Sequence, residues 1–402
     1  MSRLLRSVGA LAAFSAVAAC VAIGAATAPA ASAAGAGPLP IVTMQATRPS
    51  AGQGTACAVQ TDSTVACWGS NGYGQLGVDH RPYSLVGKRS TGLSGARAVT
   101  EGWEHTCVLL DDGSATCFGR NDAGDLGPGA ASPIAWTPSS PFRGPAAFLA
   151  LSAGWQHTCG LLANHTVVCF GRNNFGQLGD TTTRSSSAPR PVRGLAHVAS
   201  ISAGANFTCA VLSTHRVACW GQNASGQLGL PNTVRFVAHP VTIPGISNAR
   251  SVSAGFAHVC VVLSTRRVAC WGSDVKHQAG IPGPVAWTPV PHLVAGVTTA
   301  TAVASGYDHT CALLATRKVV CWGWDMQGQL GNARTGRTFS AQGVVGLSGA
   351  TSITSGFQFS CAALAGALVK CWGTGGTGQL GVGGRAQWNH PYYAAEVRVP
   401  GP

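Results

Sequence analysis

The sequence has little charge and few acidic groups. Only 10% of its 402 residues are charged, and only 13 are Asp or Glu. It contains no Gly-x-Ser-x-Gly nucleophile elbow and no His-Glu-x-x-His zinc helix, and nothing marks a pair of catalytic carboxylates. Beyond the N-terminal region, no apolar run is long enough to span a bilayer. We therefore expect a protein that is not an enzyme, that binds no cofactor or metal ion, and whose mature chain has no transmembrane segment.

Glycine and proline, in contrast, are abundant, at 54 and 22 residues. Because Gly supplies positive φ and Pro fixes φ near about −65°, this composition favours many short strands joined by tight turns. The hydrophobic fraction of 46% provides enough apolar surface to offset chain entropy, which excludes a disordered chain. The net charge of +13 is high for so few charged residues and indicates an acidic partner or surface.

The first 33 residues are typical of an export signal. Arg3 and Arg6 form a positive region, an apolar stretch follows, and Ala31–Ala33 offers a small-residue cleavage site. Residues 17–20 (Val-Ala-Ala-Cys) resemble a bacterial lipobox, so lipid attachment at Cys20 is an alternative. We expect residues 1–33 to be a signal peptide and the mature chain to be a secreted, extracellular bacterial protein.

The remaining cysteines form a regular pattern. Apart from Cys20, fourteen cysteines fall into seven pairs with a constant separation of ten, and successive pairs begin 50–52 residues apart. The chain therefore contains a repeat of about fifty residues. Because each repeat carries its own pair, the repeat reduces the many possible pairings to one. The predicted disulfides are Cys57–Cys67, Cys107–Cys117, Cys159–Cys169, Cys209–Cys219, Cys260–Cys270, Cys311–Cys321 and Cys361–Cys371.

Each pair fits a β-hairpin. In the sixth repeat, apolar segments flank a polar turn at 316–318, and this arrangement places Cys311 opposite Cys321. Opposed strand residues lie about 4.5–5.5 Å apart at Cα, which a disulfide accepts. Structural zinc sites use cysteines about two to four residues apart, so the spacing does not fit zinc. An oxidising compartment agrees with seven bonds.

Aligning the repeats on their cysteines shows other shared positions. A Ser-Ala-Gly segment stands before the pair, as at 152–154, an aromatic-Gly pair follows the second cysteine, and Gly-Gln-Leu-Gly comes next, as at 176–179. The fifth repeat departs from the pattern, with Lys276–Gly280 in place of that last motif. The pattern resembles the repeat of the regulator-of-chromosome-condensation family, including bacterial proteins described as α-tubulin-suppressor-like.

The resemblance implies an all-β fold, a seven-bladed β-propeller with four-stranded blades and one disulfide per blade, forming a single domain over residues 34–402. The tail Glu396–Val399 resembles the strand that precedes each Ser-Ala-Gly, and the segment near Ile41–Met44 resembles the strand that should follow it. We expect both termini to build one blade, which would close the ring without a free sheet edge.

Several repeated positions suggest chemistry and have simpler interpretations. A ring of histidines (His105, His157, His258 and His309) suggests a metal site, yet Phe207 and Phe359 occupy the same position in other repeats, which favours packing between blades. The aromatic residues after the second cysteine are expected in the core between blades; they are Trp68, Phe118, Phe170, Trp220, Trp271, Trp322 and Trp372. Two Gly-x-Gly-x-x-Gly matches, at 72–77 and 376–381, are not followed by a helix, so we interpret them as turn glycines.

The variable positions supply the candidate binding residues. The turn within each cysteine pair should lie on the same side of the ring in every blade. It is basic in the fourth to sixth repeats and acidic in the first two, at Asp62, Asp111 and Asp112. Exposed turns also carry charge simply for solubility. Aromatic residues in the segments between repeats are typical interface anchors, although they can equally pack against their own blade. The candidates are Arg216, Arg266, Arg267, Arg317, Lys318, Trp136 and Trp287.

These features favour a secreted, monomeric scaffold that binds another protein through loops on one propeller face. Three alternatives remain open: binding of an anionic envelope polymer or nucleic acid, an enzyme on a propeller scaffold, and a propeller-type β-lactamase inhibitor like that among secreted bacterial relatives. Eukaryotic relatives include a nuclear nucleotide-exchange factor for a small GTPase. Export and disulfides argue against that role here.

Overall fold

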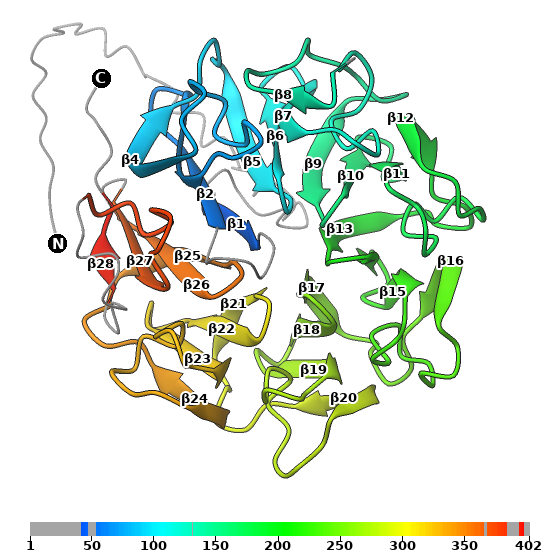
Figure 1. Cartoon of the computed structure of the whole chain (residues 1–402). Coiled ribbons are helices and arrows are strands. Elements are labelled where there is room, and N and C mark those ends of the chain that lie inside the picture. The colour runs from blue at the N-terminus through cyan, green and yellow to red at the C-terminus, as the bar shows by residue number, and fades with distance from the viewer. Residues whose placement is uncertain (1–41, 47–53, 131, 366–367, 384–393, 398–402) are drawn as a thin grey trace, which may run out of the picture. The chain divides into compact units, whose positions relative to one another are not determined.

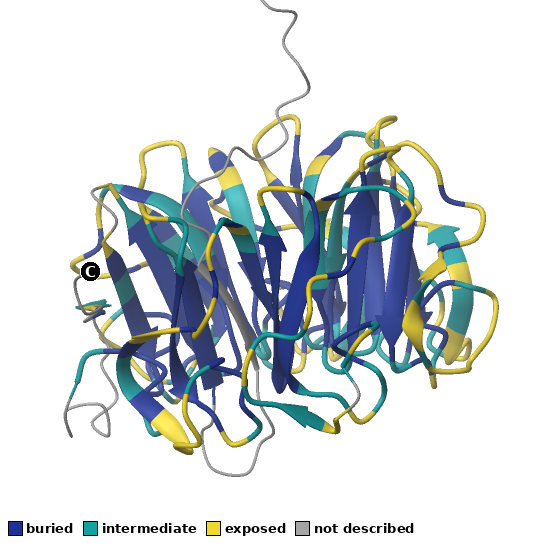
Figure 2. Ribbon diagram, turned by 90° about the horizontal axis from the view of Figure 1, so that it is seen from above, coloured by how far each residue is buried: buried dark blue, intermediate teal, exposed yellow. Residues whose placement is uncertain are grey.

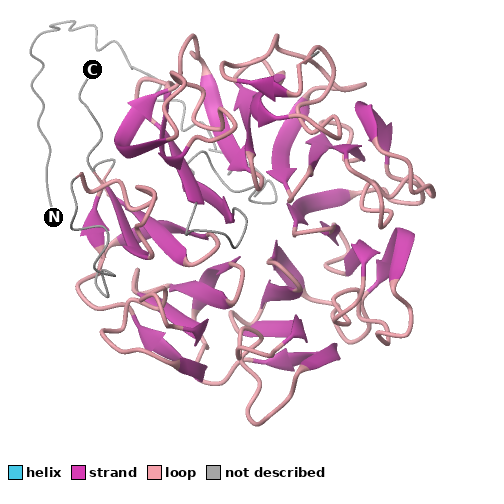
Figure 3. Cartoon of the chain, in the orientation of Figure 1, coloured by secondary structure: helices cyan, strands magenta, loops and turns pink. Residues whose placement is uncertain are grey.

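The computed structural model describes residues 42–46, 54–130, 132–365, 368–383 and 394–397. They form 28 strands in seven four-stranded antiparallel sheets, arranged as blades of a ring (Figures 1 and 3). The predicted seven-bladed β-propeller is confirmed. The predicted export signal and Cys20 lie outside the described residues. Within the described ranges, no helix has the length and apolar character needed to cross a membrane.

Each blade is built from four strands that are consecutive in the chain and pair in that order. Blade 1 contains β1 (Val42–Ala46), β2 (Gly54–Val59), β3 (Val65–Ser70) and β4 (Tyr83–Arg89). Blade 2 contains β5 (Ala96–Glu101), β6 (His105–Leu110), β7 (Ala115–Arg120) and the two-residue β8 (Ile134–Ala135). Blade 3 contains β9 (Phe148–Ala153), β10 (His157–Leu162), β11 (Val167–Gly171) and β12 (Ser186–Pro191). Blade 4 contains β13 (Val198–Ala203), β14 (Phe207–Leu212), β15 (Val217–Gln222) and β16 (Phe236–Thr242).

The remaining blades follow the same plan. Blade 5 contains β17 (Ala249–Ala254), β18 (His258–Leu263), β19 (Val268–Ser273) and β20 (Trp287–Leu293). Blade 6 contains β21 (Ala300–Ser305), β22 (His309–Leu314), β23 (Val319–Trp324) and β24 (Arg337–Gly343). Blade 7 contains β25 (Ala350–Ser355), β26 (Phe359–Leu364), β27 (Val369–Gly373) and β28 (Ala395–Glu396). The first strands of the blades contact one another in a closed circle, with β1 touching both β5 and β25.

Because the strands of a blade alternate in direction, the loops alternate between two faces of the ring (Figure 2). We call face A the side with the loops between the first and second strands and between the third and fourth, such as 204–206 and 223–235. Face B carries the hairpin turns between the second and third strands, such as 213–216, and the crossings to the next blade, such as 243–248. Each residue can therefore be assigned to a face from its place in the repeat.

The expectation that both termini share one blade is wrong. The C-terminal strand β28 pairs with β27 in blade 7, whereas the N-terminal strand β1 pairs with β2 in blade 1. Every blade is contiguous because the segment between two cysteine pairs supplies the last strand of one blade and the first strand of the next. The ring is closed between blades 7 and 1 by packing, and by the Trp68 indole N–H, which donates to the Gln379 carbonyl at 3.0 Å.

The seven predicted disulfides are confirmed, one in each blade between its two middle strands. The two cysteines of each pair are directly opposite in the ladder. Their Cα atoms lie 4.0–4.1 Å apart, closer than predicted and nearest to the narrow, non-hydrogen-bonded class of about 4.5 Å.

The repeated aromatic residues lie between blades, as predicted, and are fully buried. The five tryptophans also donate their indole N–H to a carbonyl in the preceding blade. In blades 4 to 7 the acceptors are Gln177, Gln227, Gln278 and Gln329, at 2.9–3.1 Å. The divergent fifth motif retains Gln278, so the hydrogen bond from the Trp322 indole to this carbonyl is present although the Leu and the first Gly of the motif are replaced. Five of the seven interfaces between blades thus contain the same polar contact within apolar surroundings.

The histidines also join neighbouring blades. His105, His157, His258 and His309 are buried, and their Nε2 atoms are hydrogen-bonded at 2.7–2.9 Å to a Thr or Ser hydroxyl of the next blade. Burial lowers the pKa of His105 to about 4 and the pKa of the other three to about 3, so they are neutral at neutral pH. Their role is packing between blades, as the exchange with Phe indicated.

Candidate functional site

The face A loops nearest the ring axis are positioned by the glycine of the Ser-Ala-Gly segment. At Gly154, an added Cβ would lie 2.5 Å from the carbonyl oxygen of Gly204 in the next blade, and Gly204 has the same relation to Gly255. Only glycine allows these loops to approach so closely. The sequence therefore brings the first loops of successive blades into direct backbone contact.

Backbone hydrogen bonds then connect these loops from one blade to the next. The N–H of Trp155 donates to the Ala205 carbonyl at 3.0 Å, and that of Ala205 donates to Gly255 at 3.2 Å. Phe256 and Tyr307 donate to the glycine carbonyl of the next blade at 3.2 and 3.1 Å. Since each bond joins two blades, the residue that follows each glycine is held in a fixed place.

Aromatic side chains occupy this fixed position in five blades. We call them the aromatic cluster: Trp103, Trp155, Phe256, Tyr307 and Phe357. The ring centroid of Phe256 lies 4.9 Å from that of Trp155 and 4.1 Å from that of Tyr307. The ring centroids of Tyr307 and Phe357 lie 4.6 Å apart. Trp103 meets Trp155 edge-on, at 84°. The cluster forms a continuous aromatic wall across several blades.

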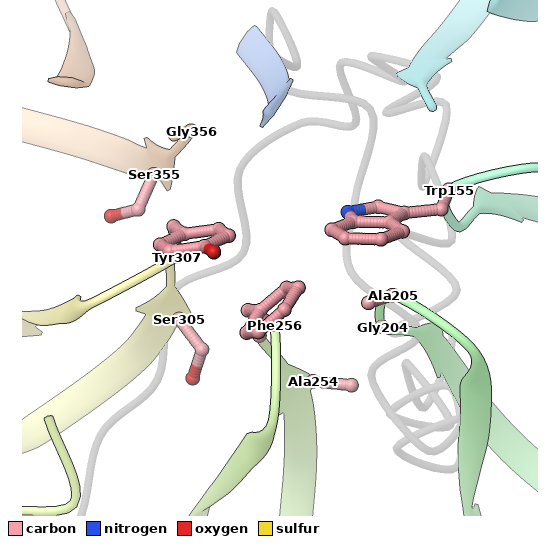
Figure 4. A pocket seen from close by; sticks show the side chains of 11 residues that line it. Trp155, Gly204, Ala205, Ala254, Phe256, Ser305, Tyr307, Ser355 and Gly356 are labelled. Atoms are coloured by element: carbon pink, nitrogen blue, oxygen red, sulfur yellow. The ribbon is translucent and has the colours of Figure 1, made fainter. Parts of the chain in front are cut away.

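Beside this wall lies a shallow, solvent-open hollow with a cavity volume of about 30 Å³. Figure 4 shows the rings of Trp155, Phe256 and Tyr307 around it, with Ser305 and Ser355 from adjacent blades. The three rings are half-buried, so one surface of each contacts solvent. Burial, and secondarily the charge of Asp308, raises the pKa of Tyr307, and burial raises the pKa of Asp308 to about 6.

A buried carboxyl group lies at the same level in blade 2. Glu101 replaces the Ala of Ser-Ala-Gly and is 1% exposed. Burial raises the pKa of Glu101 well above its usual range, because desolvation disfavours the charged carboxylate, and a hydrogen bond from the Cys57 backbone opposes this shift in part. At the equivalent position, Ala254, Ser305 and Ser355 line the hollow. Among the described residues, no group of three or more His, Cys, Asp or Glu side chains could hold a metal ion.

The predicted binding residues are divided between the two faces. Arg216, Arg266, Arg267, Arg317 and Lys318 are exposed in the turns of face B. Trp136 and Trp287 lie on face A, at or beside the outer strand of their blades, and are half-buried. Their backbone or ring lies against a turn glycine of the preceding blade, Gly74 and Gly226 respectively. The structure therefore does not unite the tryptophans and the basic residues in one site.

The predicted acidic arc is largely neutralised. Asp62 forms an ion pair with Arg89 at 2.9 Å, and Asp112 forms one with Arg143 at 2.6 Å. Both arginines come from segments that return to the turn after the third strand, so the pairing depends on the fold of the whole blade. The Gly-x-Gly-x-x-Gly segments are turns: Gly74, Gly77, Gly378 and Gly381 have φ values between 65° and 93°, and no helix follows among the described residues.

The aromatic cluster and Glu101 were not identified from the sequence. A signal was present, because an aromatic residue follows the conserved glycine in five of the seven repeats. Glu101 is likewise visible as the one acidic residue in the Ser-Ala-Gly segment.

Two models described as "Regulator of chromosome condensation (RCC1) repeat" match the chain. One matches residues 164–211 and 215–262, and the other matches 97–125, 148–177, 198–227, 249–278 and 300–329. Among curated proteins, the secretion-regulating guanine nucleotide exchange factor of Bos taurus is 29% identical over 68% of this chain and 51% of its own length. The ultraviolet-B receptor UVR8 of Arabidopsis thaliana is 28% identical over 73% and 57%. The chain spans little more than half the length of these relatives.

Solved structures share the fold. Human WBSCR16 superposes with a TM-score of 0.75 at 20% identity, covering 84% of this chain and 95% of that one. Prp20p from Saccharomyces cerevisiae gives a TM-score of 0.69 at 22% identity, covering 78% and 80%.

Proposed function

We propose, on the premise that this chain carries regulator-of-chromosome-condensation repeats on a seven-bladed propeller, that it is a secreted scaffold that binds another protein through face A. The observation that carries the proposal is the aromatic cluster, of which Trp155, Phe256 and Tyr307 line a solvent-open hollow in loops fixed by backbone hydrogen bonds between blades. Binding is the role we assign to this surface, and we assign no catalytic role to it.

Aromatic side chains held in place are efficient binding residues. Trp and Tyr dominate interface hot spots because they bury a large area while losing few rotamers. Trp155, Phe256 and Tyr307 already have fixed neighbours on either side, so little side-chain entropy remains to be lost on binding. Trp136 and Trp287, on the outer part of the same face, would extend the contact area.

Relatives support a protein partner in general terms. The yeast propeller Prp20p is described with binding properties to Gsp1p and histones, and another structure shows Kap60 bound to it. The bovine relative is named as a guanine nucleotide exchange factor. We do not propose exchange activity here, because seven disulfides favour an oxidising compartment, away from cytosolic GTPases.

Export completes the proposal. The mature chain would begin near residue 34 and comprise a single monomeric propeller domain, secreted by a bacterium, with lipid attachment at Cys20 as the alternative. Intact mass and N-terminal sequence of the secreted protein distinguish the two, because lipidation would leave Cys20 as the modified first residue.

A capture experiment tests the role of face A. Immobilised mature protein is exposed to culture supernatant and envelope extract, and compared with the double variant Phe256→Ser/Tyr307→Ser. Val290→Ser is the matched control, because Val290 is an apolar residue on the outer strand of blade 5 that is 65% exposed. We expect a stoichiometric protein partner to bind the parent and the control equally. It should bind the double variant more than about tenfold less tightly, since each hot-spot side chain contributes about 2 kcal/mol or more.

The proposal fails if the double variant, shown to be folded by its melting curve, captures the same partner with unchanged affinity. It also fails if a panel of substrates reveals turnover that the double variant loses, because face A would then be an active site.

A further inference from the structure

Face B carries a second surface, independent of the aromatic cluster. Arg216, Arg266, Arg267, Arg317 and Lys318 occupy equivalent hairpin turns in three consecutive blades, and all five are exposed. We call them the basic arc. Blades 4, 5 and 6 are neighbours in the ring (Figure 1), so the five cations occupy equivalent turns of adjacent blades on face B.

The turns of the basic arc are held rigidly. His215, Arg266 and Arg317 have φ values of 59–60°, the left-handed conformation of a tight turn. Their carbonyl oxygens accept hydrogen bonds of 2.8–3.0 Å from the first residue of the next blade, which is Ala249, Ala300 or Ala350. Each turn is thus tied to its neighbour. The basic side chains project from a fixed framework.

No opposite charge accompanies the basic arc. The acidic residues of blades 3 to 6 are Asp180, Asp274, Asp308 and Asp325, and all four belong to loops of face A. Among the described residues, none of the five cations forms an ion pair, whereas Asp62 and Asp112 in blades 1 and 2 are paired locally. Arg250, exposed near the face B end of β17, adds a further positive charge. Solubility alone does not require this separation of charge between faces.

The chemistry of the arc indicates the class of ligand. Four of its five residues are arginines, whose planar guanidinium groups match phosphate oxygens in a two-pronged geometry. The exposed Tyr and Phe residues among those described are Tyr83, Phe236 and Phe339, and all three lie within the first three residues of a fourth strand, toward its face A end. The described part of face B therefore offers none of these rings for stacking bases. A duplex, with a persistence length of about 50 nm, could touch a curved row of cations only along a tangent.

We propose that the basic arc is a docking surface for a flexible, base-free phosphate polymer of the polyol phosphate kind. Such a chain can follow the curvature of the ring and place successive phosphates against successive blades. This surface lies on the face opposite to the proposed protein site, so the two ligands could bind at the same time. The proposal does not depend on the function assigned to face A.

Titration of the mature protein with poly(glycerol phosphate), followed by calorimetry, tests the proposal. Five contacted phosphates predict a salt slope of about −3.5, by analogy with flexible single strands, and hence about 100-fold weaker binding at 200 mM than at 50 mM salt. Changing all five residues of the basic arc to Glu should abolish binding. A control variant has the same net charge as this variant, because five exposed arginines of face A are changed to Glu instead: Arg81, Arg184, Arg235, Arg334 and Arg337. It should retain most of the binding.

A second variant, with Gln at the five positions of the basic arc, removes the positive charges without adding negative ones, so it serves if charge reversal impairs folding. This variant should bind the polymer at least tenfold less tightly than the parent. Equal losses in the basic-arc and face A variants would overturn the proposal, because net charge alone would then explain binding. Tighter binding of single-stranded or duplex DNA of equal phosphate number would overturn it as well, and would assign the surface to nucleic acid. Absence of binding at 50 mM salt would refute it outright.

Discussion

The contact between blades can be tested at Trp271. Its indole N–H donates to the Gln227 carbonyl of the preceding blade at 2.9 Å, and the residue before the cysteine in blade 5 is Val259, which has no hydroxyl. In blade 6 the Gln278 carbonyl accepts from the Trp322 indole at 3.1 Å and also from Thr310 Oγ1 at 2.8 Å. Replacing either tryptophan with Phe removes the same ring volume, but Trp322→Phe leaves the Gln278 carbonyl its hydrogen bond from Thr310, whereas Trp271→Phe leaves the Gln227 carbonyl without a side-chain donor among the described residues.

The natural sequence follows the same logic. Phe118 and Phe170 stand in place of Trp in blades 2 and 3. In these blades the hydroxyl of Thr106 donates to the Gln75 carbonyl at 2.7 Å, and that of Thr158 donates to the Asp125 carbonyl at 3.2 Å. Leaving a buried carbonyl without its partner costs about 1–3 kcal/mol. We therefore expect Trp271→Phe to lower the free energy of unfolding by about 1–2 kcal/mol more than Trp322→Phe.

Urea denaturation of the two variants, with disulfides intact, measures this difference. Adding Val259→Thr to Trp271→Phe should restore much of the loss, because it supplies the hydroxyl that blades 2 and 3 already use. Equal destabilisation by the two Trp→Phe changes, or no rescue by Val259→Thr, would refute the argument that the carbonyl donor decides which aromatic residue each blade accepts.

Three further predictions follow from buried groups. Removing one disulfide with Cys260→Ala/Cys270→Ala should leave a folded protein less stable by about 2–3 kcal/mol, measured by urea denaturation. Because the pKa of Glu101 in the folded protein lies above its ordinary value of 4.5, the protein should lose stability as the pH rises from that value. Glu101→Gln should abolish this loss, so the melting temperatures of the parent and the variant should coincide near pH 4 and differ by pH 8. Because the folded pKa of His258 is about 3, below its ordinary 6.5, stability falls as pH drops through that window, and His258→Phe should melt with a weaker pH dependence between pH 6.5 and 4.

The repeat made much of the fold predictable. Cysteines ten residues apart in seven equivalent hairpins determine their own partners, and the aromatic residues that follow them must lie between blades because they occupy the same place in each. The closure of the ring was predicted incorrectly, because the partner of a terminal strand depends on where the blade boundary falls. The ion pairs Asp62–Arg89 and Asp112–Arg143 could not be predicted, since they require the chain after the third strand to return to the turn.

The candidate site was harder to predict for a related reason. The aromatic cluster forms only because ring closure brings equivalent loops together, so each member, such as Phe256, looks like an ordinary loop residue within its own repeat. The division between faces, in contrast, follows from the alternation of strand direction. That alternation alone places Arg266 and Trp287 on opposite sides of the ring.

Hydrogen exchange of the propeller with its captured protein partner tests the central claim most directly. The account predicts slower amide exchange in the face A loops 204–206, 255–257 and 306–308 on binding, with no change in the face B turns 213–216, 264–267 and 315–318. Protection confined to those turns, or to the outer strands, would contradict the assignment of face A as the protein-binding surface.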